Sequence, residues 1–179
     1  MLATASHLRA VPTPESKLES LFRQHYDQIF RTAYRVTGNA NDAEDVLQTV
    51  FLRLARRKND LELAPNPQAY LLRAAINASL DIVRARTVNN LVPIDEVAPE
   101  KFSTHRNPET LQADRELRAL IQNEISKLSQ NSAEMFVLKY FEGYDNKEIA
   151  QMLGTSHLVV GVLLHRARSQ MKKRIEAAL

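Results

Sequence analysis

The segment from Asn41 to Leu54 carries the pattern that most constrains the fold of this chain. Apolar residues recur there every three or four positions, the spacing of a helix face that packs against a core. These residues are Ala43, Val46, Leu47, Val50, Phe51 and Leu54. A second face of the same helix carries Asp45, Gln48, Thr49 and Leu52. Because this face combines polar groups with a leucine, it favours contact with another protein over contact with water.

Helical spacing extends over most of the chain, and no segment shows the apolar–polar alternation typical of a strand. Helices are predicted at about 16–37, 41–58, 67–86, 108–128, 132–142, from Asp145 onward, and from Ser156 to about Ala177. Asn41 or Asp42 is expected to cap the second of these helices. Asp145 and Glu148 have the spacing of a capping box. The predicted fold class is therefore all-α.

Prolines and charge divide the chain into segments. Residues 1–15 lack periodicity and are predicted to be a disordered tail, whereas 16–86 and 111–179 are predicted to be two small helical domains. Residues 87–110 contain three prolines and no helical period, which predicts a flexible linker. Residues 16–86 carry 11 basic and 8 acidic residues, and residues 111–179 carry 10 basic and 8 acidic residues. The linker carries 2 basic and 4 acidic residues. The domains suit contact with phosphate, and the linker is either an ordinary solvated segment or one that enters a positively charged channel of a partner.

Composition excludes several classes of protein. The 179 residues include no cysteine, which rules out disulfides and thiolate metal sites. The histidines lack the spacing of metal ligands, and no nucleophile has an organised base, so we expect no metal, no cofactor and no enzymatic activity. No apolar run reaches the ~18–20 residues of a membrane span, and the N-terminus lacks the organisation of a secretory signal. We therefore expect no membrane insertion.

Two blocks of the sequence, in a fixed order, carry a resemblance to a known family. The first block includes the segment 41–58 and a helix at 67–86 with the pattern Asn77-x-x-x-Asp81-x-x-Arg84, and the second is a helix-turn-helix pattern within 128–174. Together they resemble bacterial RNA polymerase sigma factors of the extracytoplasmic-function type, group 4 of the sigma-70 family. The resemblance implies that residues 16–86 form region 2, which binds core RNA polymerase and recognises and melts the −10 element. It implies that residues 111–179 form region 4, whose helix-turn-helix recognises the −35 element.

The resemblance assigns core-polymerase binding to Asp45, Gln48, Thr49 and Leu52, with threonine where the family usually has glutamate. It also implies that Asn77 and the loop 63–69 hold a base flipped from the −10 element. The residues implied in −10 DNA binding are Tyr70, Arg73, Asn77, Asp81, Arg84 and Arg86. Tyr70 stands where the family usually has tryptophan, and it keeps an aromatic plane. Spacing alone favours ordinary pairs on a helix surface for Asn77, Asp81 and Arg84, and the resemblance reverses that preference.

The segment from Ser156 to Arg168 is expected to be the recognition helix, with Val160, Leu164, Ala167 and Met171 facing the core. The residues implied in −35 DNA binding are Gly161, Val162, His165, Arg166, Arg168, Lys172 and Lys173. The outward face departs from the family, because Val159, Gly161, Val162 and Leu163 replace polar or basic residues. Three explanations fit this departure. The valines contact thymine methyls in an AT-rich −35 element, or the patch binds a protein such as an anti-sigma factor, or this module no longer reads DNA.

The resemblance implies an alternative sigma factor that binds core RNA polymerase and promoter DNA and directs promoter-specific transcription initiation. It implies a cytoplasmic protein, associated with the nucleoid through the polymerase and controlled by an anti-sigma factor. The main alternative is a sigma mimic that sequesters an anti-sigma factor without directing transcription. The apolar recognition helix favours the mimic, whereas the set of Asn77, Asp81 and Arg84 opposes it. A simple helix-turn-helix repressor would leave the first domain unexplained.

Overall fold

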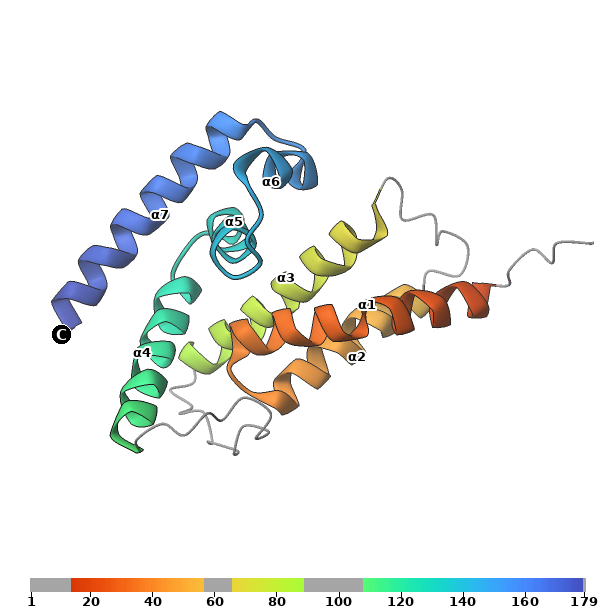
Figure 1. Cartoon of the computed structure of the whole chain (residues 1–179), viewed down its shortest axis with the longest axis horizontal. Coiled ribbons are helices and arrows are strands. Elements are labelled where there is room, and N and C mark those ends of the chain that lie inside the picture. The colour runs from red at the N-terminus through yellow and green to blue at the C-terminus, as the bar shows by residue number, and fades with distance from the viewer. Residues whose placement is uncertain (1–13, 57–65, 89–107, 179) are drawn as a thin grey trace, which may run out of the picture.

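The computed structural model describes residues 14–56, 66–88 and 108–178, and every regular element within these ranges is an α-helix (Figure 1). The helices are α1 (Pro14–Thr37), α2 (Ala40–Arg56), α3 (Pro67–Val88), α4 (Pro108–Ser126), α5 (Gln130–Tyr140), α6 (Asn146–Leu153) and α7 (His157–Ala178). The predicted all-α fold class is confirmed. Most of the predicted tail and linker, and the first part of the loop 63–69, lie outside the described residues.

Helices α1, α2 and α3 form an N-terminal module around one hydrophobic core. The six apolar residues predicted to line the inner face of α2 are all buried. They pack against Ile29 and Ala33 of α1 and against Leu71, Ala75 and Ala78 of α3. The ring of Phe22 meets that of Phe51 edge-on, with 4.8 Å between centroids, and extends this core toward the start of α1. Burial of its inner face leaves the opposite face of α2 available for a partner.

A tight turn joins α1 to α2. Gly38 adopts a left-handed conformation with φ +71°, which is unfavourable for residues with a Cβ. The next residue, Asn39, caps α2, because its side-chain oxygen accepts a hydrogen bond from the amide of Asp42 at 3.1 Å. The prediction that Asn41 or Asp42 caps this helix was wrong, since α2 already begins at Ala40.

Helices α4 to α7 form a C-terminal module that includes the helix-turn-helix. The predicted capping box at the start of α6 is present: Asp145 accepts from the amides of Lys147 and Glu148 at 2.7 and 2.8 Å, and Glu148 accepts from the amide of Asp145 at 2.7 Å. The amide of Glu148, followed by that of Lys147, lowers the pKa of the Asp145 carboxyl. The four residues of α7 predicted to face the core, Val160, Leu164, Ala167 and Met171, are all buried.

Helix α3 lies between the other helices of the N-terminal module and the C-terminal module (Figure 1). One side of it belongs to the N-terminal core, as described above. Its other side contributes Leu72, Ile76, Leu80 and Val83 to a second core that includes Ile125, Leu128, Leu138 and Ile149 of the C-terminal half. The two modules therefore share hydrophobic contacts, and we call this the docked arrangement. The sequence analysis did not predict that the C-terminal module buries these α3 residues.

Candidate nucleic-acid interface

The four α2 residues predicted to bind the polymerase lie together on the face of α2 that is turned away from the core. Asp45, Gln48 and Leu52 are exposed and Thr49 is half-buried. The side chain of Leu52 is notable, because it remains 56% exposed although leucine is normally buried. The structure thus presents an apolar group beside a carboxylate and an amide on one accessible helix surface, a combination suited to a protein contact.

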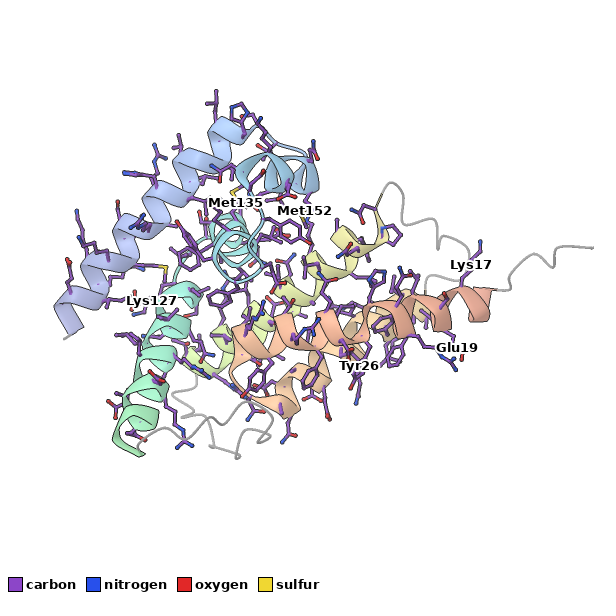
Figure 2. All side chains as sticks on the ribbon, in the orientation of Figure 1. Lys17, Glu19, Tyr26, Lys127, Met135 and Met152 are labelled. Atoms are coloured by element: carbon purple, nitrogen blue, oxygen red, sulfur yellow. The ribbon has the colours of Figure 1, made fainter. Side chains whose placement is uncertain are left out.

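Arg73 of α3, predicted to bind −10 DNA, is held by the C-terminal module. Its Nε donates to the Glu134 carboxylate of α5 at 2.7 Å, and its Nη1 donates to the carbonyl oxygen of Met152 at 3.1 Å. Figure 2 shows Met152 on the side of α6 that faces α3. Glu134 is 3% exposed, so its charge depends on this arginine for compensation. In this state two of the three guanidinium nitrogens of Arg73 are engaged by the C-terminal module, although the side chain is still 40% exposed.

Asn77 and Arg84 of α3 share a second contact with the C-terminal module. The side-chain amide of Gln130 donates to Asn77 Oδ1, and its oxygen accepts from Nη1 of Arg84. Arg84 also donates to the carbonyl oxygens of Ser126 at 3.2 Å and Leu128 at 3.1 Å. The C-terminal end of a helix exposes carbonyl oxygens with partial negative charge. The carbonyl oxygens at the end of α4 therefore accept hydrogen bonds from Arg84 as phosphate oxygens would.

The other predicted −10 residues have different surroundings. Arg86 forms an ion pair with Asp42 and donates to the carbonyl oxygen of Thr37 at 3.4 Å, so its contacts stay within the N-terminal module. Burial raises the pKa of the Asp42 carboxyl, an effect that the Arg86 guanidinium only partly offsets. Tyr70 is half-buried against the N-terminal core, and Asp81 is exposed. The six residues therefore lie on one helix but do not form one free surface.

The predicted −35 residues lie on α7, on the opposite edge of the C-terminal module from α3 (Figure 1). His165, Arg166, Arg168, Lys172 and Lys173 are all exposed. Lys172 forms a loose ion pair with Glu176 at 3.6 Å, a surface contact of little energetic weight. Val162 is 51% exposed and Gly161 is half-buried. The accessible surface of α7 is thus apolar near its N-terminus and cationic beyond it.

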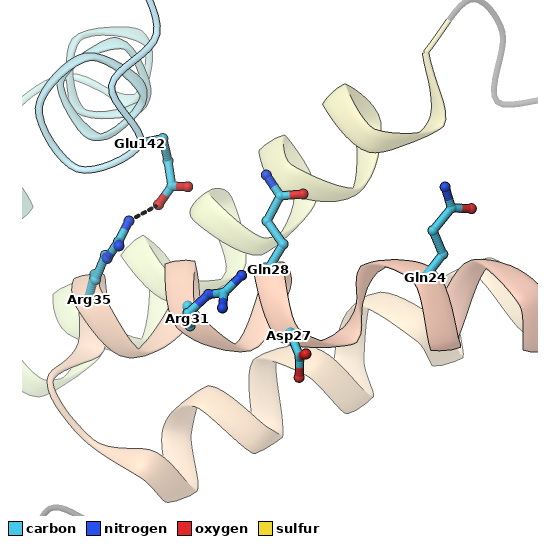
Figure 3. A pocket seen from close by; sticks show the side chains of 6 residues that line it. All are labelled: Gln24, Asp27, Gln28, Arg31, Arg35 and Glu142. Atoms are coloured by element: carbon cyan, nitrogen blue, oxygen red, sulfur yellow. Dashed lines mark hydrogen bonds and ion pairs between the residues drawn. The ribbon is translucent and has the colours of Figure 1, made fainter. Parts of the chain in front are cut away.

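A shallow groove of about 660 Å³ runs beside α1 (Figure 3). It is lined by Gln24, Asp27, Gln28, Arg31, Arg35 and Glu142. Arg35 bridges the modules here, because it donates to Glu142 at 3.2 Å and to the carbonyl oxygen of Phe141 at 2.7 Å. The groove holds charges of both signs, and no group of three or more His, Cys, Asp or Glu suitable for a metal occurs among the described residues. Its arginine–glutamate pair serves the docked arrangement.

Glu134 and Gln130 are the residues that sequence reasoning missed. Neither was singled out, although both contact predicted DNA-binding residues. One signal was present: Glu134 lies between Ala133 and Met135 in a helix whose neighbouring residues are buried. A carboxylate in such a position requires a cationic partner from elsewhere in the chain. Sequence alone does not say which cation supplies it.

Comparison with known proteins gives a consistent result. The family model Sigma-70 region 2 matches residues 21–88, and the model Sigma-70, region 4 matches residues 118–171. The ECF RNA polymerase sigma factor SigE of Mycolicibacterium smegmatis is 32% identical over 86% of this chain, which spans 60% of that relative's length. SigW of Bacillus subtilis, an ECF RNA polymerase sigma factor, is 26% identical over 83% of each chain.

A solved structure shares the fold. The sigma factor RpoE of Bartonella quintana, in a co-crystal with the anti-sigma factor NepR, matches with a TM-score of 0.53 and 17% identity, covering 88% of this chain and 96% of that one. At this identity the likeness supports the fold alone. Among the described residues, no helix has the length and apolar character needed to cross a membrane.

Proposed function

Because this chain belongs to the sigma-70 family of bacterial RNA polymerase sigma factors, in its extracytoplasmic-function group, we propose that it binds core RNA polymerase and directs promoter-specific transcription initiation. The observation that carries this proposal is the presence of both family regions, in order, in one chain whose α2 face is accessible. Sigma factors are transcription initiation factors, and the function we propose rests on binding rather than on catalysis. The protein acts where the polymerase acts, in the cytoplasm and on the nucleoid.

Each module has a separate role in this proposal. Residues 16–86 bind the polymerase through Asp45, Gln48, Thr49 and Leu52, and they recognise and melt the −10 element through α3. Residues 111–179 recognise the −35 element through α7, and residues 87–110 link the two modules. Contacts that this protein makes only with the opened −10 strand, including a flipped base held at Asn77, stabilise the melted promoter relative to the closed one.

The docked arrangement has a consequence for the order of events. Glu134 and Gln130 compete with DNA for Arg73, Asn77 and Arg84. The modules therefore separate before the −10 element is read, whereas the α2 face and the outer surface of α7 need no such rearrangement. A partner that favours the docked arrangement would keep the factor inactive, and this is the role we propose for an anti-sigma factor.

Transcription of fragmented genomic DNA by purified core polymerase, with and without this protein, tests the proposal. Sequencing of RNA 5′ ends should reveal new start sites that share a −10 sequence and a −35 sequence. A chain with Leu52 replaced by glutamate should not produce these starts, because the charge disrupts the polymerase contact. The matched control is Leu117→Glu on α4, where the leucine is similarly exposed at 48% but lies outside the proposed face.

The second candidate function is a mimic that sequesters an anti-sigma factor. The exposed apolar residues at the start of α7 favour it, since a DNA-reading surface is usually polar or basic. The same assay separates the two functions. A folded protein that binds core polymerase weakly and yields no new start sites would support the mimic and refute the sigma factor.

A further inference from the structure

The outer surface of α7 carries a cluster of exposed apolar side chains. Leu158 is 69% exposed, Val159 44% and Val162 51%. Among the described residues eight large hydrophobic side chains are exposed, and three of them fall within these five consecutive positions. Leu158 and Val162 lie one helical turn apart and Val159 lies beside them, so they form one patch. A patch of this kind indicates a contact surface rather than a random exposure.

Gly161 lies within this patch and has no internal reason to be glycine. A Cβ added there would meet only Asn146 Nδ2, at the ordinary contact distance of 3.7 Å, and its backbone is not left-handed. Glycine in a helix interior is less stable than alanine, so the packing of this chain does not account for the choice. A missing side chain beside Val162 does allow the surface of a partner to approach the helix closely.

The basic residues that follow indicate the chemistry of that partner. The residues exposed on α7 beyond the patch are His165 and the cations Arg166, Arg168, Lys172 and Lys173. In a helix-turn-helix, the N-terminal part of the second helix contacts base edges, while nearby cations contact phosphates. Alkyl side chains cannot pair with the donors and acceptors of guanine, cytosine or adenine, and the one apolar group in the major groove is the thymine C5-methyl.

We propose that Leu158, Val159 and Val162 read thymine C5-methyl groups in the −35 element, with the cations of α7 holding the flanking phosphates. The inference rests on the proposed sigma function and specifies which base that function selects. In this inference, specificity comes from contact between these alkyl side chains and the thymine C5-methyl group. It does not come from bidentate hydrogen bonds of the kind by which arginine reads guanine. Because these three side chains are exposed in this structure, the surface is accessible even in the docked arrangement.

Replacing thymine by uracil tests this directly, because uracil lacks only the C5-methyl and pairs identically. The templates are promoters from the transcription assay above, prepared with thymine or uracil in the −35 element. The complete polymerase with this protein should initiate less on uracil templates, by about fourfold for each thymine contacted. Val162→Thr, which keeps the side-chain shape but replaces a methyl by a hydroxyl, should reduce this uracil penalty. Val88→Thr, at an exposed valine of α3, should leave the penalty unchanged.

Each outcome decides the matter. A uracil penalty that shrinks only in Val162→Thr supports the inference. Equal initiation on both templates by an active polymerase overturns it, and so does a set of start sites with a common −10 but no common −35 sequence. In both of those cases promoter-specific initiation by this protein stands and the patch belongs to a protein partner, whereas the absence of a common −35 sequence also refutes −35 recognition by α7. No new start site at all refutes the proposed function and this inference together.

Discussion

We predict that Gln130→Ala shifts the chain from the docked arrangement toward separated modules by about 30-fold. The Gln130 side chain accepts a hydrogen bond from the Arg84 guanidinium and donates one to Asn77. Hydrogen bonds between neutral groups contribute about 1 kcal/mol and those to charged groups somewhat more, so losing both weakens docking by about 2 kcal/mol. This is about 30-fold in the docking equilibrium. Arg84 keeps its contacts to the carbonyl oxygens of Ser126 and Leu128 in the Gln130→Ala chain, so the estimate of about 30-fold does not include them.

Energy transfer between two dyes measures this equilibrium. The chain contains no cysteine, so Ser20→Cys on α1 and Ser169→Cys on α7, both at exposed positions, provide two specific labelling sites. Single-molecule spectra without DNA should show a larger fraction of low-transfer molecules in the Gln130→Ala chain, with unchanged helical circular dichroism. Gln170→Ala, at an exposed glutamine of α7, is the control. An unchanged ratio, or an equal change in the control, would refute the assignment of Gln130 to docking.

Three further predictions concern single positions. Leu52→Glu should weaken binding to core polymerase by about tenfold or more while Leu117→Glu does not, and equal affinities in a pull-down titration would contradict the role of α2. Gly38→Ala and Gly143→Ala should lower the free energy of unfolding by similar amounts: both have positive φ, and the Gln122 Nε2 that would lie 2.5 Å from the Cβ added at Gly38 is the end of a flexible side chain that can move away. A clearly lower urea midpoint for Gly38→Ala would contradict this. Asp145→Ala should lower the Tm at neutral pH, because the capping carboxylate is lost. Since the folded-state pKa of Asp145 is lowered from 3.8, its contribution is fully present above that pH and disappears as the pH falls through the folded-state pKa. A gap between the two melting temperatures that persists at the lowest pH would contradict this.

Local patterns predicted most of the helices but not how the modules meet. The inner faces of α2 and α7 follow from periodicity, because burial on one side of a helix repeats every three to four residues. The capping box at Asp145 follows from residue types at a fixed spacing. The cap of α2 was misplaced because Asn39, Asn41 and Asp42 are all suitable residues within four positions. Periodicity could not decide among them.

The contacts between the two modules join residues that are far apart in the sequence, so local patterns could not predict them. Arg73 and Glu134 are 61 residues apart, and Asn77 and Gln130 are 53 apart. Whether such residues meet depends on the packing of α3 against two cores, which no local signal encodes. For the same reason the sequence grouped Tyr70, Arg73, Asn77, Asp81, Arg84 and Arg86 as one surface, although their surroundings differ. The roles of these residues stay predictions.

Helix α3 has almost no side that serves a single purpose, and this limits how the protein can be redesigned. One side lies in the N-terminal core, another in the shared core, and the polar groups between them bind the C-terminal module. On the proposed function, a substitution in α3 that retargets the −10 sequence will therefore also change how readily the two modules separate, so promoter choice and output level will vary together. The outer surface of α7 takes no part in the contacts described between the modules, so on the same proposal −35 specificity can be altered there on its own.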